Sequence, residues 1–390
     1  MPEHTRSDDD IHYSLKKEIN EYYWSVAIKS FAVSLVGLFG PIYVFLYFDQ
    51  SVINTMLFYL PQYIAIVLLV PIAVHTLEKW GLKKSMAIGN PILSIYLLCL
   101  MLAGIYGFTF IILAAIARVL HIIFFFPARH ADFAKFASSK KMGQQVGTAN
   151  IIATAVRVLA PLFGGLIIVN FGFTPLFIIA SVLIFISMLP LFFSPEIYEH
   201  YSFSYLQTFA FPFKKENWRT SIAFFFEGME VVIIAILFSI FIYTVIGNFE
   251  TIGWVVSASS LLLIFFIYFM GWLIDKKGNK KILSITSVIN SIAWIVNAFI
   301  AAPFRCLIYS SVYKLTETGT RLPFNSLFYK NAHKKKHGAD EYIIYHEVVL
   351  NTGRAVMCLI VITGFYFGIT AFLPYFMLAA FSVLMFRLVK

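Results

Sequence analysis

The chain has 390 residues, of which 60% are hydrophobic and only 13% carry charge. A water-soluble globule is about half apolar, so this composition excludes a soluble protein and indicates a protein that resides in a bilayer. The net charge of +10 could suggest nucleic acid as a partner. No base-reading motif accompanies the Lys and Arg residues, and we therefore expect no nucleic-acid binding.

Apolar runs long enough to cross the hydrocarbon follow one another along the whole chain. A spanning helix needs about 20 apolar residues. Twelve segments meet this requirement, and none shows the alternating polarity of a transmembrane β-strand. The predicted spanning helices lie near residues 24–48, 52–76, 85–105, 108–128, 145–169, 174–194, 220–246, 251–275, 282–302, 304–327, 342–366 and 369–386.

The positive charges gather in alternate connections between these segments. Segments that stay in the cytoplasm keep an excess of Lys and Arg close to the membrane. Basic residues occur at both ends of the chain and in every even-numbered loop, whereas the odd loops offer at most Arg305. We therefore predict that both termini lie on the cytoplasmic side of the cell membrane. The first 20 residues carry charge throughout, so we do not expect them to form a cleavable signal peptide.

Two stretches of the chain resemble each other at a spacing of about half its length. "VHTLEKWGLKK" at 74–84 aligns with "GWLIDKKGNKK" at 271–281, and near the same offset Arg157 pairs with Arg354. Several landmarks at one spacing indicate a duplication. We predict four parts: a cytoplasmic segment 1–23, a six-helix bundle 24–194, a cytoplasmic linker 195–219 and a second six-helix bundle 220–390.

The second of these stretches resembles the signature of the major facilitator superfamily, G-x-x-x-D-x-x-G followed by basic residues, between the second and third helices of a half. The resemblance extends over the whole chain, because an arginine midway along the fourth helix, Arg118 in "IARVLH", also stands where that family has one. It implies an all-α membrane protein with twelve transmembrane helices in two pseudo-symmetric six-helix bundles.

The same resemblance implies a conformational latch that holds the two halves together on the cytoplasmic side. Glycine permits a sharp turn or close helix contact, and Asp275 can face the N-terminus of a neighbouring helix, where negative charge is favoured. The first copy has Val74 and Glu78 at the family's Gly and Asp positions, so we expect it to be weakened. The latch candidates are Gly271, Asp275, Lys276, Gly278, Lys280 and Lys281 with Glu78, Gly81, Lys83 and Lys84.

The fifth predicted helix contains "RVLAPLFGG", which is similar to a stretch found in exporters of the family. Pro161, Gly164 and Gly165 match that stretch, and Ala160 stands where exporters have glycine. The resemblance therefore favours export of a small solute, with uptake or exchange as the alternative.

Several charged residues lie midway along predicted spanning helices. Such groups are costly in hydrocarbon and by default face a bundle interior or a cavity, whereas Lys29 and His75 are close enough to helix ends to snorkel. The buried cations outnumber the carboxylates, which favours an organic anion as an alternative substrate; a set of purely structural salt bridges is the other interpretation. The candidates are Glu227, Glu230 and Glu317 for proton coupling and Arg118, Arg157, Lys314, Arg321 and Arg354 for the charge of a substrate cavity.

Transport is the function that these features favour. No nucleophile elbow, phosphate-binding loop or clustered metal ligands are present in the sequence, so we expect neither an enzyme nor a cofactor. We predict a monomeric secondary transporter that works by alternating access among membrane lipids and binds a small-molecule substrate and protons, with Glu230 as the preferred proton site and Arg118 or Lys314 nearby. Sodium coupling, and a receptor, scaffold or lipid scramblase on the same fold, remain alternatives.

Overall fold

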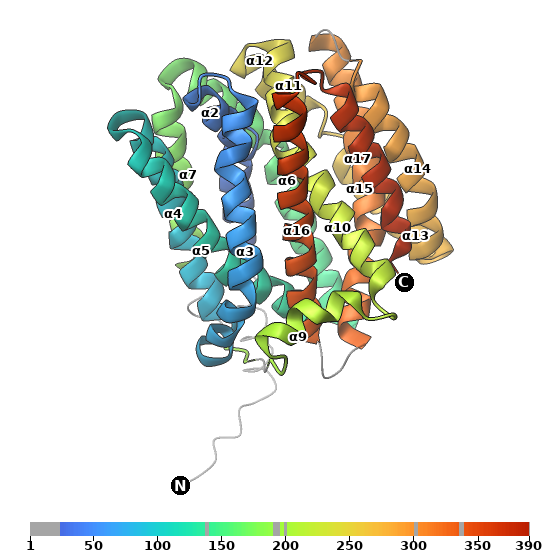
Figure 1. The fold of residues 1–390 in the computed structure, drawn as a ribbon. Coiled ribbons are helices and arrows are strands. Elements are labelled where there is room, and N and C mark those ends of the chain that lie inside the picture. The colour runs from blue at the N-terminus through green and yellow to red at the C-terminus, as the bar shows by residue number, and fades with distance from the viewer. Residues whose placement is uncertain are drawn as a thin grey trace, which may run out of the picture.

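A computed structural model of the chain is helical throughout, without a strand in the residues that it describes, which are 24–136, 140–189, 196–198, 201–299, 303–334 and 339–389. The predicted segment 1–23 lies outside them. Figure 1 shows the helices running roughly side by side, with the earlier helices on one side of the molecule and the later helices on the other.

In the described residues of the first half, six helical rods occupy the predicted segments. They are the span Trp24–Tyr47, which ends in α2 (Phe39–Tyr47), then α3 (Val52–Trp80), α4 (Leu82–Tyr106), α5 (Phe108–Phe136), α6 (Lys140–Phe171) and α7 (Phe173–Ser187). The described part of the linker contains the short α9 (Tyr205–Ala210) and the 3-10 turn η1 (Phe211–Phe213), and α9 lies across one end of the bundle (Figure 1). We refer to this end as the linker end.

The second half begins with one long rod made of α10 (Trp218–Val232), the π-helical turn η2 (Ile233–Leu237) and α11 (Phe238–Ile246). It continues with α12 (Phe249–Ala258) and α13 (Leu263–Lys277), which a turn separates, then α14 (Asn279–Asn297) and α15 (Pro303–Lys334). The chain closes with α16 (Ala339–Tyr366), α17 (Leu373–Met385) and the 3-10 turn η3 (Phe386–Leu388).

In the described part of the chain, eight helices are long and apolar enough to cross a membrane, and two shorter apolar helices accompany them. α15 is outside this group because its polar side chains lower its hydropathy. The protein is thus a multi-pass membrane protein, and a count of twelve spans in two bundles stays a prediction.

The outer surface of the bundle is apolar. On α3, Leu57, Leu68 and Ile72 are each about half exposed, whereas Tyr63 and Ile66 on the inner face are buried. A water-soluble helix would show the reverse arrangement, with polar residues outward. This outward apolar face is suited to contact with lipid.

The two repeated stretches have the same backbone geometry. Gly81 connects α3 to α4 with φ +84°, and Gly278 connects α13 to α14 with φ +82°. This left-handed region favours glycine because a Cβ is strained there. The equivalent turns support the predicted duplication. Gly271, by contrast, has open space around its Cα among the described residues, so the close helix contact that we expected there is absent from them.

The most extensive contacts between the two halves are made by two pairs of helices, α3 with α16 and α6 with α12. Glycines let the second pair approach closely: a Cβ on Gly253 would lie 2.6 Å from the carbonyl oxygen of Pro161, and one on Gly165 would overlap the carbonyl of Phe249. Gly164 likewise lets α6 approach the first span closely, because a Cβ on Gly164 would lie 2.6 Å from the carbonyl oxygen of Leu35. The glycines of "RVLAPLFGG" are therefore packing residues at the end opposite the linker end.

We predict that Gly165→Val loosens this contact, because overpacking of a tight interface costs roughly 1–3 kcal/mol. A cysteine that replaces the buried Ser257, whose Oγ accepts a hydrogen bond from the Leu162 N–H, should then react several-fold faster with a membrane-impermeant maleimide. The native cysteines are buried and give a low background. Gly37→Ala is the control, since a Cβ there meets nothing; equal labelling of the two variants would contradict the prediction.

Candidate functional site

Three carboxylates gather around one guanidinium inside the second half. Arg321 on α15 donates from Nη1 to Oε1 of Glu227 at 2.9 Å and from Nη2 to Oε2 of Glu230, while its Nε lies 3.9 Å from Oε1 of Glu317. Nε2 of His346 on α16 lies 3.0 Å from the other carboxylate oxygen of Glu227. We call these five residues the carboxylate cluster.

Close packing of α10 against α16 brings the cluster together. A Cβ on Gly228 would overlap the carbonyl of Leu350, and one on Gly353 would overlap the carbonyl of Phe225, so the two backbones touch through paired glycines. The spacing of three residues between Glu227 and Glu230 directs both side chains to the same face. The π-helical turn η2 follows Glu230 closely, and such turns are frequent at functional sites.

Glu230 is the most secluded member of the cluster. Its side chain is fully buried, and its Oε1 has no hydrogen-bond partner among the described residues. The buried rings of Trp294 and Tyr313, whose centroids are 4.6 Å apart, line the same core region. A carboxylate in such surroundings depends on Arg321 for its compensation.

The polar network extends from the cluster toward the first half. Glu347, next to His346 on α16, accepts a hydrogen bond from Asn351, and its Oε1 lies 3.6 Å from Nε2 of His130 on α5. His130 also lies 2.9 Å from the hydroxyl of Tyr329. Sequence reasoning missed His130 and His346 because the histidines are scattered along the chain and share no spacing with the other charged residues.

A second group of charges lines a cavity of about 520 Å³. Arg118 on α5 and Arg157 on α6 reach it from the first half, and Arg354 on α16 reaches it from the second. The guanidinium carbon of Arg118 lies 5.3 Å from the ring centre of Tyr63, and that of Arg354 lies 5.7 Å from the same ring. We call this space the arginine cavity.

The arginine cavity also contains Lys29, which corrects our expectation that Lys29 snorkels to the membrane surface. Its Nζ donates to Oδ1 of Asn90 at 2.5 Å and lies 2.8 Å from the ring centre of Phe125. His75 does lie near a helix end, 3.3 Å from Glu78.

Lys314 and Arg321 do not line the arginine cavity, although the sequence grouped them with its charges. Nζ of Lys314 donates to the carbonyl of Val256 and to Oγ of Ser260, both at 2.6 Å. It thereby stabilises the carbonyl end of α12 at the break before α13. The expectation that Arg118 and Lys314 share a cavity with Glu230 is therefore wrong, and Arg321 is the cation that the glutamates contact.

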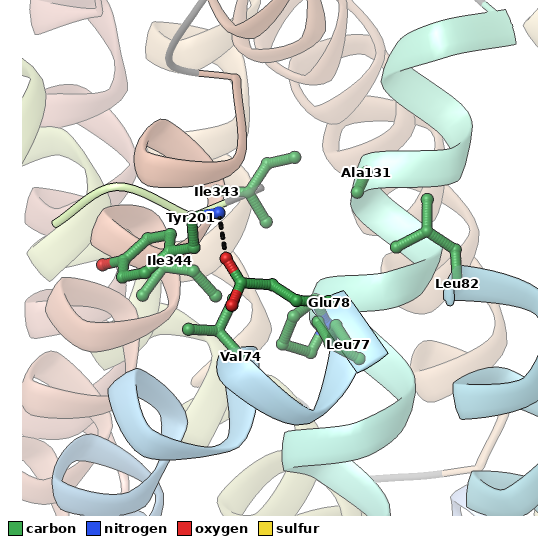
Figure 2. A pocket seen from close by; sticks show the side chains of 9 residues that line it. Val74, Leu77, Glu78, Leu82, Ala131, Tyr201, Ile343 and Ile344 are labelled. Atoms are coloured by element: carbon green, nitrogen blue, oxygen red, sulfur yellow. Dashed lines mark hydrogen bonds between the residues drawn. The ribbon is translucent and has the colours of Figure 1, made fainter. Parts of the chain in front are cut away.

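The latch candidates differ between the two copies, and Figure 2 shows the contacts of the first copy. In the first copy, Oε1 of Glu78 accepts a hydrogen bond from the backbone N–H of Tyr201 at 2.6 Å, and Val74 and Leu77 face Ile343 and Ile344 of α16. In the second copy, Asp275 is exposed and forms no hydrogen bond or ion pair within the described part of the chain. The first copy is thus not the weaker one in this structure.

The linker reinforces the first copy. The carboxylate of Glu196 accepts hydrogen bonds from the backbone N–H groups of Lys83 (2.7 Å) and Lys84 (3.1 Å), at the N-terminus of α4. Negative charge is favoured at that position. Nζ of Lys83 forms an ion pair with Asp132 at 2.7 Å, and Ser202 donates to Glu341 at the start of α16. Lys276, Lys280 and Lys281 of the second copy are exposed.

Tyr201 itself lies outside the spanning helices and is buried in this contact. Burial raises its pKa to about 12, so its hydroxyl stays protonated and forms a hydrogen bond of 2.7 Å with Thr208. Among the described residues, no group of three or more His, Cys, Asp or Glu side chains is arranged to hold a metal ion.

Comparison with known proteins agrees with the arrangement of helices. The Major Facilitator Superfamily model matches residues 23–215. The chain is also similar to "Uncharacterized protein YqgE" of Bacillus subtilis (strain 168), with 25% identity over 228 residues, which are 56% of this chain and 53% of that protein. The match thus spans about half the length of this relative. The chain belongs to the major facilitator superfamily, a family of membrane transporters that bind small-molecule substrates.

Proposed function

We propose that the protein is a proton-coupled secondary transporter that moves a small solute across the cell membrane by alternating access. The observation that carries this proposal is the carboxylate cluster, in which Glu227, Glu230 and Glu317 share the single guanidinium of Arg321. Three ionised carboxylates and one guanidinium leave a net negative charge inside the membrane. Such a charge is costly, and a bound proton reduces the cost.

The cluster can respond to the conformation of the protein because α16 takes part in it and also contacts α3 of the other half. When the halves move, Glu347 and its neighbour His346 change their relation to His130 on α5, whose Nε2 lies 3.6 Å from Oε1 of Glu347. A carboxylate whose partners change between two states binds a proton in one and releases it in the other. Glu230 is the proposed proton site, Glu227 exchanges protons with it, and Glu317 is the third member.

The proposed architecture is twelve spanning helices in two six-helix bundles, 24–194 and 220–390, with the linker end on the cytoplasmic side. The excess of Lys and Arg in the connections at that end supports this orientation. The likeness of "RVLAPLFGG" to exporters supports outward movement of the solute.

We expect Glu230→Gln and Glu227→Gln to abolish solute transport driven by a pH gradient and to preserve solute exchange at equal concentrations, because neither amide can carry a proton through the cycle. The measurement uses proteoliposomes that contain a pH-sensitive dye, screened with a broad solute panel for solute-dependent proton flux. Glu216→Gln, in the exposed turn just before α10, is the matched control and should behave like the unchanged protein.

If both cluster variants retain full accumulation driven by the pH gradient, Glu227 and Glu230 are structural and proton coupling through them is wrong. If no solute of the panel moves through the unchanged protein while labelled lipid flips freely, the scramblase alternative replaces the transporter.

The proposal includes a latch at the linker end, made by Glu78 and Glu196 in this conformation. We expect Glu78→Ala to release the linker from α3, because the N–H of Tyr201 loses its acceptor, and to open the contact between α3 and α16. If the contact opens, a cysteine that replaces the buried Ile344 should react with a maleimide several-fold faster than it does in the protein that keeps Glu78. Asp275→Ala is the control, since Asp275 is exposed; an equal effect of both variants would refute the assignment of the latch to the first copy.

A further inference from the structure

The arginine cavity is strongly positive. Among the described residues, its lining contains Lys29, Arg118, Arg129, Arg157 and Arg354. Its one acidic residue, Asp132, already forms an ion pair with Lys83 at 2.7 Å. Arginine keeps its proton in proteins, so this positive charge does not disappear by deprotonation.

The hydrogen bonds of two of these arginines orient them without neutralising them. Nη1 of Arg118 donates to the amide oxygen of Gln62, and Nη1 of Arg354 donates to the amide oxygen of Asn351, both at 2.9 Å. Nε of Arg354 is buried and has no hydrogen-bond partner in the part of the chain that the structure describes. Donors are therefore left available on a positively charged wall.

Two like charges lie against one ring. The guanidiniums of Arg118 and Arg354 contact Tyr63 from opposite halves of the protein, at 5.3 and 5.7 Å from its ring centre. The aromatic ring attracts each cation, but it does not cancel their mutual repulsion. An anion between them would do so, and guanidinium groups are well suited to carboxylate and phosphate oxygens.

The remaining lining combines polar side chains, which are Ser25, Ser30, Ser34, Asn90 and His121, with an apolar and aromatic wall. It includes Val33, Leu93, Ile122, Phe125 and Phe126. The volume of about 520 Å³ is within the usual range for sites that bind small molecules. A simple inorganic ion would leave this apolar wall unused, whereas an organic molecule with one charged end would cover it.

We propose that the arginine cavity binds a small amphipathic organic anion, with its carboxylate or phosphate held by Arg118, Arg157 and Arg354 and its apolar part against the phenylalanines. The assignment of this anion as a transported substrate rests on the proposed transport function. The proposal assigns a chemical class to the solute, which was so far undefined. It also gives a role in binding to Arg157, whose Nη2 donates to Oγ of Ser30 at 3.1 Å.

The test measures binding to the purified full-length protein in detergent, so that it requires neither transport nor proton coupling. The probes are matched pairs of acids and neutral amides: benzoate and benzamide, 2-naphthoate and 2-naphthamide, indole-3-acetate and indole-3-acetamide. At least one acid should raise the Tm by several degrees in a concentration-dependent manner, because a ligand that binds only the native state stabilises it. Its amide should leave the Tm unchanged.

Loss of a charged hydrogen-bond donor typically costs about 1.5–3 kcal/mol, so Arg118→Gln, Arg157→Gln and Arg354→Gln should each weaken acid binding at least about tenfold. Arg219→Gln, an exposed position outside the cavity, is the matched control. Where a glutamine variant does not fold, the lysine variant takes its place and should retain part of the acid binding because it keeps the charge.

The proposal is overturned if no acid stabilises the protein more than its amide, or if the arginine variants bind the acid as well as the Arg219→Gln control does. Retained acid binding in Glu230→Gln, together with lost proton flux, would support both proposals. Acid binding without any proton flux in the unchanged protein would refute the coupling and leave the anion site intact.

Discussion

Hydrocarbon offers no hydrogen bonds and little screening, and this constraint governs the arrangement of every charged side chain inside the bundle. The charges are not dispersed as isolated ion pairs. Apart from Lys314 and the ion pair of Lys83 with Asp132, they divide into the carboxylate cluster between α10, α15 and α16 and the arginine cavity bordered by α5, α6 and α16. One group has an excess of carboxylates and the other has an excess of guanidiniums, and the proton and the anion proposed as their ligands carry the opposite charge.

α16 is the element that connects the two groups. His346 contacts Glu227 of the cluster, Glu347 lies near His130, Asn351 bonds both Glu347 and Arg354, and Arg354 reaches the cavity. The helix also packs along α3 of the other half. A displacement of α16 therefore acts on both charge groups together, which is the physical requirement for coupling two ligands through one conformational change.

The sequence was sufficient for the positions of the helices and for most of the buried charges, because apolar length and the cost of an intramembrane charge are local properties. The sequence also shows Glu227 three residues from Glu230 and Glu317 four residues from Arg321, spacings that place each pair on one face of a helix. It failed for Lys314 and Lys29, since both bond to helices far away in the sequence. It likewise missed the contact of His346 with Glu227, which depends on the tight packing of Gly228 and Gly353. The linker, whose Tyr201 N–H bonds to Glu78, is also a partner that no motif encodes.

The position of Tyr63 suggests how binding and movement depend on each other in the proposed cycle. Its ring is shared by Arg118 of one half and Arg354 of the other, so the two guanidiniums repel each other across the boundary along which the halves separate. An anion that both arginines bind replaces this repulsion by attraction and favours the arrangement in which the halves meet there. Without the anion, the same residues favour separation.

Because Arg354 is joined through Asn351 and Glu347 to the surroundings of the carboxylate cluster, the gain or loss of an anion changes the environment in which a proton is held. Opposite charges in two neighbouring sites thus give the protein a physical means of linking the movement of an anion to that of a proton.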